Sequence, residues 1–387
     1  MKALRPVAAA VVAVGLIAAA SGIRADPTGD SIDLGAVFNI TGTQAVFGVP
    51  SRAAADLAAA KINAAGGVLG LPLQLSHIDG NSSPEDLGAL VRARLGETGD
   101  LAALFGLADT DLALSAAGAA AEAGRVFLTS GATSPKLPAE VPGFLFLACF
   151  GDNVQAAAAA EWAYGRKGFR TVLVLFEDDK TYPKLLKDYF VTRFGELGGT
   201  IQAALPITPR GAEIGLPEIG HPDAIFLSVT TAEDAAPVIG AIRAAGYAGP
   251  ILGGDGYDAE AIWAAHPEIS DVFFTTHVYL GPDNPDPAIA EFVAAYTTET
   301  GEVPNGFAAL AYDAVGLLAA AMTAEGSADP DRIGPGLHAI GAYHGLTGTI
   351  SYPTGTRIPR KSVTILEVAA GKQGLVETLM PTQVPPP

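Results

Sequence analysis

The sequence predicts an α/β protein built from two similar, doubly wound lobes. Short apolar runs alternate with amphipathic, Ala-rich stretches at intervals typical of βαβ units. Several of these runs are apolar throughout, as expected for parallel strands that are covered on both faces. The order strand, loop, helix, Gly-Gly, strand also occurs twice, beginning near residue 32 and again near residue 171.

The first 25 residues have the pattern of an export signal. Lys2 and Arg5 precede an apolar run, residues 7–20, and small residues follow it up to Ala25. The run is shorter than the roughly 20 residues needed to cross a bilayer. We therefore assign residues 1–25 to a signal peptide, with cleavage after Ala20 as the alternative to cleavage after Ala25. No later segment is expected to span a membrane.

Length, charge and cysteine content narrow the class of protein. The mature chain of about 360 residues exceeds what one hydrophobic core usually holds, so two domains are expected. Removing the signal removes three basic residues and leaves 20 basic against 41 acidic side chains, a net charge of −21. Such a surface repels nucleic acid. The single cysteine, Cys149, lies in an apolar run and is interpreted as a small buried hydrophobe.

Glycine pairs mark the ends of two predicted helices. Residues 51–65 have helical apolar spacing and end in Gly66-Gly67, and residues 182–197 end in Gly198-Gly199. The predicted strands are Ile32–Phe38, Leu73–Ile78, Leu101–Gly106, Val126–Thr129, Thr171–Phe176, Thr200–Pro206, Ala224–Ser228, Pro250–Gly253 and Val272–Thr276. Later helices are predicted at 288–300, 307–325 and 331–340, strands at 348–352 and 362–368, and a frayed tail at 380–387.

Ligands of open parallel sheets bind beyond the carboxyl ends of the strands, so loops at those ends are the first candidates. Residues 128–135 join a strand to a predicted helix and bring together hydroxyls and free backbone N–H groups, and Gly131, Ala132 and Thr133 are the candidate ligand-binding residues among them. Together with a helix N-terminus they would form a cradle for a carboxylate. Thr110, in the neighbouring loop, would add a second hydroxyl. The alternative is that these hydroxyls only cap their own helices.

A second candidate loop, residues 253–258, follows a strand of the second half. Asp255, flanked by glycines, suits the binding of a ligand ammonium, and Tyr257 would supply an aromatic wall. Tyr182 and Phe47 are further aromatic candidates. The alternative is a turn rich in Asp and Gly for backbone reasons, with aromatic rings that serve only in packing.

Motifs of catalysis and metal binding are absent from the sequence. It contains no Gly-x-Ser-x-Gly elbow, His-Glu-x-x-His, Cys-x-x-Cys or phosphate-binding glycine motif, and its six histidines are scattered. We therefore expect no enzymatic activity, no metal site and no cofactor. His277 follows a strand where the chain changes lobes and is a candidate for ligand contact, or for a hydrolase that would use it together with Asp255.

Over residues 31–370 the chain resembles the Leu/Ile/Val-binding family of type I periplasmic binding proteins. The resemblance rests on five landmarks, which are specific only in combination: Lys61–Gly70, Ala132–Leu137, Asp152–Gln155, Gly253–Gly256 and Ala311–Val315. It implies two Rossmann-like lobes with parallel-rich sheets, joined by three crossovers. The N-terminal lobe would comprise residues 26–151 plus 278–361, and the C-terminal lobe residues 152–277 plus 362–387.

The resemblance also implies a function. Such a protein would be periplasmic, would capture an amino acid or related carboxylate by hinge closure, and would deliver it to an ABC permease in the inner membrane; we expect a monomer. By position, Thr110, Ala132 and Thr133 match the residues that hold an α-carboxylate. Asp255 matches the acid that takes the α-ammonium, and Tyr182 matches an aromatic lining residue.

The sequence departs from the family in two respects. The family's small disulfide cannot form here. Phe47 and Thr230 lie where the family often has larger aromatic groups, and Thr230 and Tyr257 suggest a differently shaped side-chain pocket. Two alternatives remain open. The protein would serve as a periplasmic sensing subunit, or it would bind an aromatic or aliphatic carboxylate that lacks an amine, in which case Asp255 would contact a hydroxyl or water.

Overall fold

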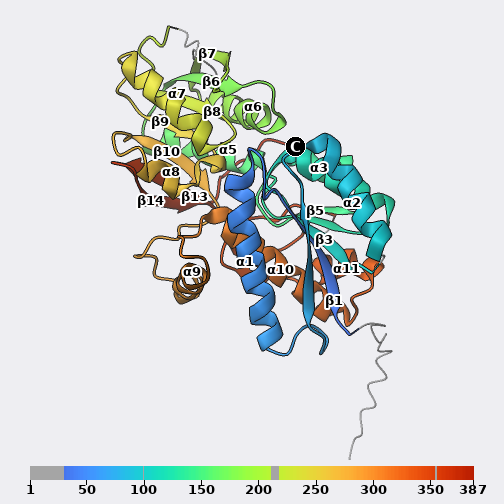
Figure 1. Ribbon diagram of the computed structural model, residues 1–387. Coiled ribbons are helices and arrows are strands. Elements are labelled where there is room, and N and C mark those ends of the chain that lie inside the picture. Colours follow the sequence, from blue (N-terminus) through green and yellow to red (C-terminus); the bar gives the residue numbers. More distant parts are fainter. Residues whose placement is uncertain (1–29, 99, 211–217, 354) are drawn as a thin grey trace, which may run out of the picture.

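The computed structural model describes residues 30–98, 100–210, 218–353 and 355–387. The predicted signal peptide, residues 1–25, lies outside the described residues. Figure 1 shows two lobes, one built around strands β1 to β5 and the other around strands β6 to β10, with α1 and α10 beside the first sheet.

The first sheet has five parallel strands in the order β2-β1-β3-β4-β5. They are β1 (Ile32–Phe38), β2 (Leu73–Asp79), β3 (Ala103–Gly106), β4 (Phe127–Thr129) and β5 (Leu145–Leu147). Alternate β1 side chains pack on opposite faces: Leu34 contacts the cluster with α1, α10 and α11, and Val37 the cluster with α2 and α3. These helices are α1 (Ala45–Ala64), α2 (Pro84–Thr98), α3 (Thr110–Glu122), α10 (Gly306–Glu325) and α11 (Pro330–Ala339).

The second sheet has seven strands in the order β14-β13-β10-β9-β8-β6-β7. Its parallel part is β6 (Thr171–Glu177), β7 (Thr200–Ile207), β8 (Ala224–Ser228), β9 (Ile251–Gly253) and β10 (Val272–Thr276). The antiparallel strands β13 (Val363–Ala369) and β14 (Lys372–Leu379) complete it. Helices α5 (Asp152–Glu161) and α6 (Thr181–Glu196) pack on one face, and α7 (Ala232–Ala244) and α8 (Glu260–Ala264) on the other.

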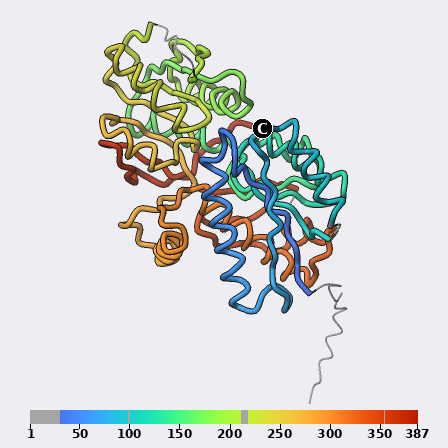
Figure 2. Tube along the Cα trace, viewed as in Figure 1, coloured from blue at the N-terminus to red at the C-terminus, as the bar shows by residue number. Residues whose placement is uncertain are grey.

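The parallel parts of the two sheets share one topology, which confirms the prediction of two similar α/β lobes. In each, the first strand lies between the second and the third, so the strand order reverses beside β1 and beside β6. Ligands bind at such reversal points, beyond the carboxyl ends of the strands. The chain passes between the lobes three times, after β5, after β10 and before β13, and Figure 2 lets the reader follow these passages along the trace.

Several elements differ from the sequence-based prediction. Helix α1 begins at Ala45, ahead of the predicted start at residue 51, and continues through Pro50, so Phe47 lies on a helix. The apolar run around Cys149 contains an unpredicted strand, β5, and β14 was also not predicted. The remaining short elements are α4 (Leu137–Glu140), the hairpin β11 (Tyr343–Gly345) and β12 (Gly348–Ile350), and a π-helical turn at Trp162–Arg166.

The C-terminal tail is anchored, so the prediction that it frays is wrong. The backbone N–H of Thr382 donates to Glu161 Oε2 at 2.8 Å, and Asn153 Nδ2 donates to the Pro385 carbonyl at 2.8 Å. Glu161 is itself held by Arg193, with 2.7 Å between Oε1 and Nη2. Thr382 of the tail therefore uses an acceptor position on Glu161 that the ion pair with Arg193 leaves open.

No segment after the signal peptide was expected to span a membrane, and helix α10 nevertheless resembles a membrane span in length and composition. Among the described residues, it alone has the length and the apolar composition of a membrane span, with a mean hydropathy of 1.6 over its most apolar window. However, 72% of that window is buried inside the protein, where Val315 and Leu318 pack in the cluster shared with α1 and the first sheet. Its composition reflects a core position.

Candidate functional site

A small cavity lies between the two lobes, where loops from both sheets meet. The volume that the centre of a water molecule can occupy in it is about 10 Å³, which is room for roughly one water. First-lobe residues follow β1, β3 and β4 or begin α10, and second-lobe residues follow β6, β8 and β9. They are Gln44, Phe47, Ala108, Asp109, Thr133, Tyr182, Thr230, Asp255, Gly256 and Phe307.

Five residues predicted from the sequence line this cavity: Phe47, Thr133, Tyr182, Thr230 and Asp255. Thr133 of the first lobe and Asp255 of the second lobe thus line the same small cavity. The Phe47 ring packs on Phe307, with 4.3 Å between ring centroids. The Thr230 hydroxyl donates to Glu177 Oε2 at 2.5 Å, so it is already engaged within the second lobe.

Asp255 begins the short 3₁₀ turn that follows β9, and the glycines around it are required by close contacts. A Cβ atom on Gly254 would lie 2.2 Å from the Tyr182 hydroxyl oxygen, and one on Gly256 would lie 2.1 Å from the Thr230 carbonyl oxygen. Gly254 therefore lets the Tyr182 hydroxyl reach the acid, and Gly256 lets the backbone of Thr230 pack against the turn. The side chain of Asp255 is buried, with 2% of the residue exposed.

Three protein groups hold the carboxylate of Asp255. Oδ1 accepts hydrogen bonds from the Tyr182 hydroxyl at 2.7 Å and from Gln155 Nε2 at 3.1 Å. His277 Nε2 lies 2.9 Å from Oδ2. An ionised carboxylate has about four acceptor positions, so one position on Oδ2 is left for a further donor.

His277 supports Asp255 from behind, at the point where the chain leaves β10. Its ring stacks on Phe150 of the first crossover, with 3.9 Å between centroids. Burial lowers the pKa of His277, so the ring is neutral at pH 7 and carries its proton on Nε2 to donate to Asp255. His277, a candidate for ligand contact from the sequence, contacts the acid Asp255 in this structure. Sequence reasoning did not identify Gln155, although it lies in a recognised landmark.

Two hydroxyl groups of the first lobe were predicted to bind a ligand, those of Thr133 and Thr110. Thr133 follows β4 and lines the cavity. Thr110, the first residue of α3, is not among the lining residues but follows the lining residue Asp109, and its buried hydroxyl has no hydrogen-bond partner among the described residues. The Oε1 atom of Gln44, which lines the cavity, is unpartnered as well. Buried polar atoms without partners are costly, so these atoms are available to a ligand.

The backbone of Gly131 and Ala132 does not form the predicted cradle. Gly131 N–H donates to the Leu107 carbonyl at 3.0 Å, and Ala132 N–H donates to Thr129 Oγ1 at 3.0 Å. Both donors are therefore used to hold the loop against β3 and β4. Gly131 is needed for space, because a Cβ there would lie 2.9 Å from the ring of Phe307.

Tyr257 is also not a wall of the cavity, contrary to prediction. It is fully buried in the second-lobe core, where its hydroxyl donates to the Leu227 carbonyl at 2.7 Å. Its ring contacts Trp263, with 5.8 Å between centroids. A Cβ on Gly253 would lie 2.2 Å from the Tyr257 ring, so this glycine gives the ring its place in the core.

The site is rich in acids, and no Lys or Arg is among the residues that line the cavity. Asp109 and Asp255 line it, and Gln155 Nε2 bridges Asp255 to Asp152, whose Oδ1 accepts at 3.0 Å. Burial, reinforced by the Asp255 charge, raises the pKa of Asp152 to about 8. Burial also raises the pKa of Asp109. These raised pKa values reduce the negative charge around the cavity, so the Asp255 carboxylate, with no basic side chain beside it in the lining, is the group suited to a positively charged ligand group.

A direct contact holds the two lobes together beside the cavity. The Thr181 hydroxyl, at the start of α6, donates to Asp111 Oδ1 at 2.6 Å, and Thr181 N–H lies 3.4 Å from Asp111 Oδ2. Asp111 belongs to α3 of the first lobe, so an acid of one lobe caps a helix N-terminus of the other. This pair, the Asp111–Thr181 latch, is made in the closed arrangement described here.

Comparison with known proteins gives this geometry a family context. The model of the periplasmic binding protein family matches residues 31–373. A curated relative, Leu/Ile/Val-binding protein homolog 1 of Brucella abortus (strain 2308), is 26% identical over 330 residues, which cover 81% of this chain and 84% of the relative.

Two solved structures illustrate the fold. The branched-chain amino acid transporter substrate binding protein LivJ from Streptococcus pneumoniae, in complex with isoleucine, has a TM-score of 0.80 at 23% identity and covers 91% of this chain and 100% of its own. A solute binding protein of an ABC transporter from Rhodopseudomonas palustris, in complex with 3,4-dihydroxybenzoic acid, has a TM-score of 0.76 at 21% identity, covering 92% and 99%. The chain belongs to the periplasmic binding protein family.

Proposed function

We propose that this protein captures a small amino acid in its interlobe cavity and delivers it, as a periplasmic monomer, to an ABC permease. The observation that carries the proposal is that Thr133 and Asp255, which come from different lobes, line one buried cavity. In this arrangement the solute's carboxylate would meet hydroxyls of the first lobe, and its ammonium would meet the acid of the second.

The ammonium end of the solute would bind Asp255. One acceptor position remains on Oδ2 after Tyr182, Gln155 and His277 have donated, and an ammonium would fill it. Because the site is buried and no Lys or Arg lines it, the attraction between these opposite charges is screened far less than in water.

The carboxylate end would bind the hydroxyls of Thr110 and Thr133. The Thr110 hydroxyl is buried without a partner, so a ligand oxygen would satisfy it. Nearby acids would repel an anion only if they were ionised. The raised pKa of Asp152, about 8, keeps it mostly protonated at pH 7, which reduces that repulsion.

Capture requires the lobes to move. A space of about 10 Å³ holds no amino acid, so the lobes would separate to admit the solute and then close around it less tightly. The three crossovers supply the hinge, and the Asp111–Thr181 latch would re-form at the edge of the closed site. Binding would then exclude water from both charged groups of the solute.

A solute that lacks an amine is the second candidate. The observation that favours it is that Asp255 already has three protein donors, so its charge does not depend on a ligand ammonium. Against it stands the lining, which has no basic side chain to balance the net charge of a simple carboxylate.

A thermal-shift screen of the mature protein separates the two candidates. The amino acids would be compared with matched acids that lack the amine, for example leucine with 4-methylpentanoate, and aromatic acids such as 4-hydroxybenzoate would be included. A cognate solute at about 100 times its Kd stabilises the folded state by about 2.7 kcal/mol. We expect stabilisation by an amino acid and none by its deaminated analogue. Stabilisation by the amine-free acids alone would overturn the proposal.

A further inference from the structure

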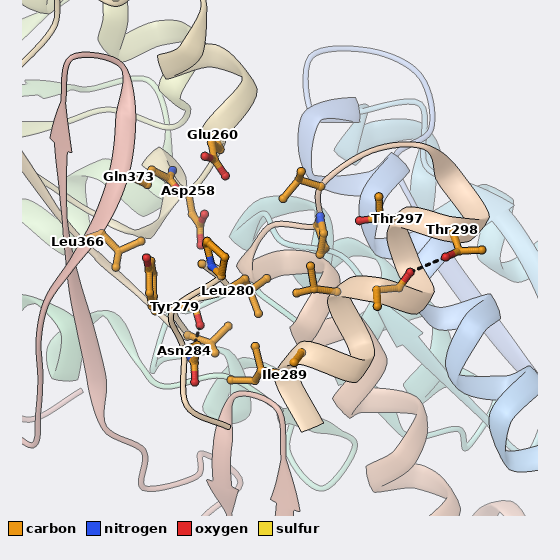
Figure 3. Close-up of a pocket in the computed structure, with 18 residues that line it drawn as sticks. Asp258, Glu260, Tyr279, Leu280, Asn284, Ile289, Thr297, Thr298, Leu366 and Gln373 are labelled. Atoms are coloured by element: carbon orange, nitrogen blue, oxygen red, sulfur yellow. Dashed lines mark hydrogen bonds between the residues drawn. The ribbon is translucent and has the colours of Figure 1, made fainter. Parts of the chain in front are cut away.

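A second and much larger cavity lies on the hinge side of the molecule, which we call the hinge groove. It has a volume of about 750 Å³, within the range of roughly 300 to 1,000 Å³ typical of small-molecule sites. One wall comes from Asp258, Glu260 and Leu366 of the second lobe. Helix α9 (Pro287–Thr300) forms the opposite wall, and the second crossover, residues 278–284, runs between them (Figure 3).

The groove is apolar along its body and acidic at one end. Val278, Leu280 and Ile289 are among its apolar residues, whereas Asp258 and Glu260 lie close together at one end in Figure 3. No Lys or Arg is found among the described residues that line it. The charge of the groove is therefore complementary to a cation that carries an apolar body.

Asp258 is a buried acid that lacks a cationic neighbour in this lining. Its Oδ2 accepts from the Thr276 hydroxyl at 2.5 Å and from Gly306 N–H at 3.1 Å, which leaves acceptor positions on the carboxylate. Burial raises the pKa of Asp258 to about 6, so it is mostly ionised at pH 7. Buried charges are normally paired, and a bound ammonium would provide the partner.

Gln373 supplies an independent sign of a ligand. Its Nε2 atom is buried without a hydrogen-bond partner, and the side chain lies near Asp258 in Figure 3. An occupant with an oxygen acceptor close to its amine would satisfy this donor. The polar end of the groove therefore combines an acceptor for an ammonium with a donor for a neighbouring oxygen.

Helix α9 shapes the apolar wall. Ala290, Ala294, Thr297 and Thr298 all line the groove and are all exposed, and their spacing places them on one face of the helix. Because these side chains are small, the face leaves space between α9 and the second lobe instead of filling it.

We propose that the hinge groove is a second ligand site, distinct from the interlobe cavity, that binds a small amphipathic amine with a neighbouring hydroxyl, such as an amino alcohol. The ammonium contacts Asp258 and Glu260, the hydroxyl accepts from Gln373, and the apolar body lies against α9. This inference does not depend on the identity of the solute in the interlobe cavity.

The test uses phenylalaninol as the probe and ligand-observed NMR titration of the mature protein without added solute. Ala294→Trp fills the groove from an exposed helix position, and Ala288→Trp places the same ring on α9 at an exposed position outside the groove. Asp255→Asn reports any binding of the probe in the interlobe cavity. Glu260→Gln removes one charge at the acidic end, and 3-phenylpropan-1-ol is the probe without its amine.

We expect Ala294→Trp to weaken phenylalaninol binding by about tenfold or more, while Ala288→Trp and Asp255→Asn leave it unchanged. Glu260→Gln should weaken it by about threefold, as expected for an exposed charge, and the amine-free alcohol should bind more weakly than the amine to the unmodified protein. Unchanged binding to Ala294→Trp, absence of binding up to about 10 mM, or equal binding of the alcohol would overturn the proposal. Loss of binding in Asp255→Asn alone would place the probe in the interlobe cavity and also overturn it.

Discussion

The substitution Asp255→Asn tests the role of this acid without changing its shape. In the variant, Oδ1 still accepts from Tyr182 and Gln155, and the new amide nitrogen faces His277 Nε2. The neutral His277 ring can move its proton to Nδ1, which has no partner in the structure, so Nε2 becomes an acceptor. We therefore expect the free energy of unfolding to change by about 1 kcal/mol or less.

The effect of Asp255→Asn on binding should be larger. A desolvated ammonium that loses its anionic partner loses about 2 kcal/mol or more of binding free energy, equivalent to roughly 30-fold in Kd. Isothermal titration calorimetry with the amino acid found by the thermal-shift screen measures this directly. Asp188→Asn, at an exposed position on α6, is the matched control and should leave Kd unchanged. An unaltered Kd in a folded Asp255→Asn protein would refute the reasoning.

Three further predictions follow from the site. Thr133→Val should raise Kd by about tenfold, because the solute's carboxylate loses a hydroxyl donor; calorimetry showing no change would remove Thr133 from the site. Thr181→Val removes the Asp111–Thr181 latch and should speed solute release in stopped-flow experiments, whereas an unchanged rate would show that the latch does not secure closure. Burial raises the folded-state pKa of Asp152 to about 8 from about 4 when unfolded, so this residue costs stability as pH rises between those values. The Tm of Asp152→Asn should therefore rise relative to the unmodified protein between pH 5 and pH 8, and parallel curves would contradict the raised pKa.

The fold was largely predictable because its strands are covered on both faces. The apolar runs of β1, β8 and β10 were placed at their observed bounds, since few other segments are so continuously apolar. The antiparallel strand β14 escaped prediction because its exposed side chains interrupt the apolar pattern. The tail was expected to fray because the acceptors that hold it, on Glu161, lie more than 200 residues earlier in the sequence.

The candidate site was predictable where a residue directly follows a strand. Thr133 and Asp255 do so, and the carboxyl ends of the two parallel sheets face one cavity. The prediction that Tyr257 lines the cavity was wrong because successive residues of a 3₁₀ turn point about 120° apart. The ring of Tyr257 therefore points into the core, where Gly253 leaves room for it. Phe307 was missed because it reaches the cavity from α10, after two crossovers, where no local pattern marks it.

The most direct test of the central claim is the chemical identity of the solute that the native protein carries. Protein purified from its native host without dialysis would be denatured, and the released small molecules would be identified by mass spectrometry with and without an amine-specific reagent. The account predicts a small molecule that bears both a primary amine and a carboxylate. A bound acid that lacks an amine would contradict it.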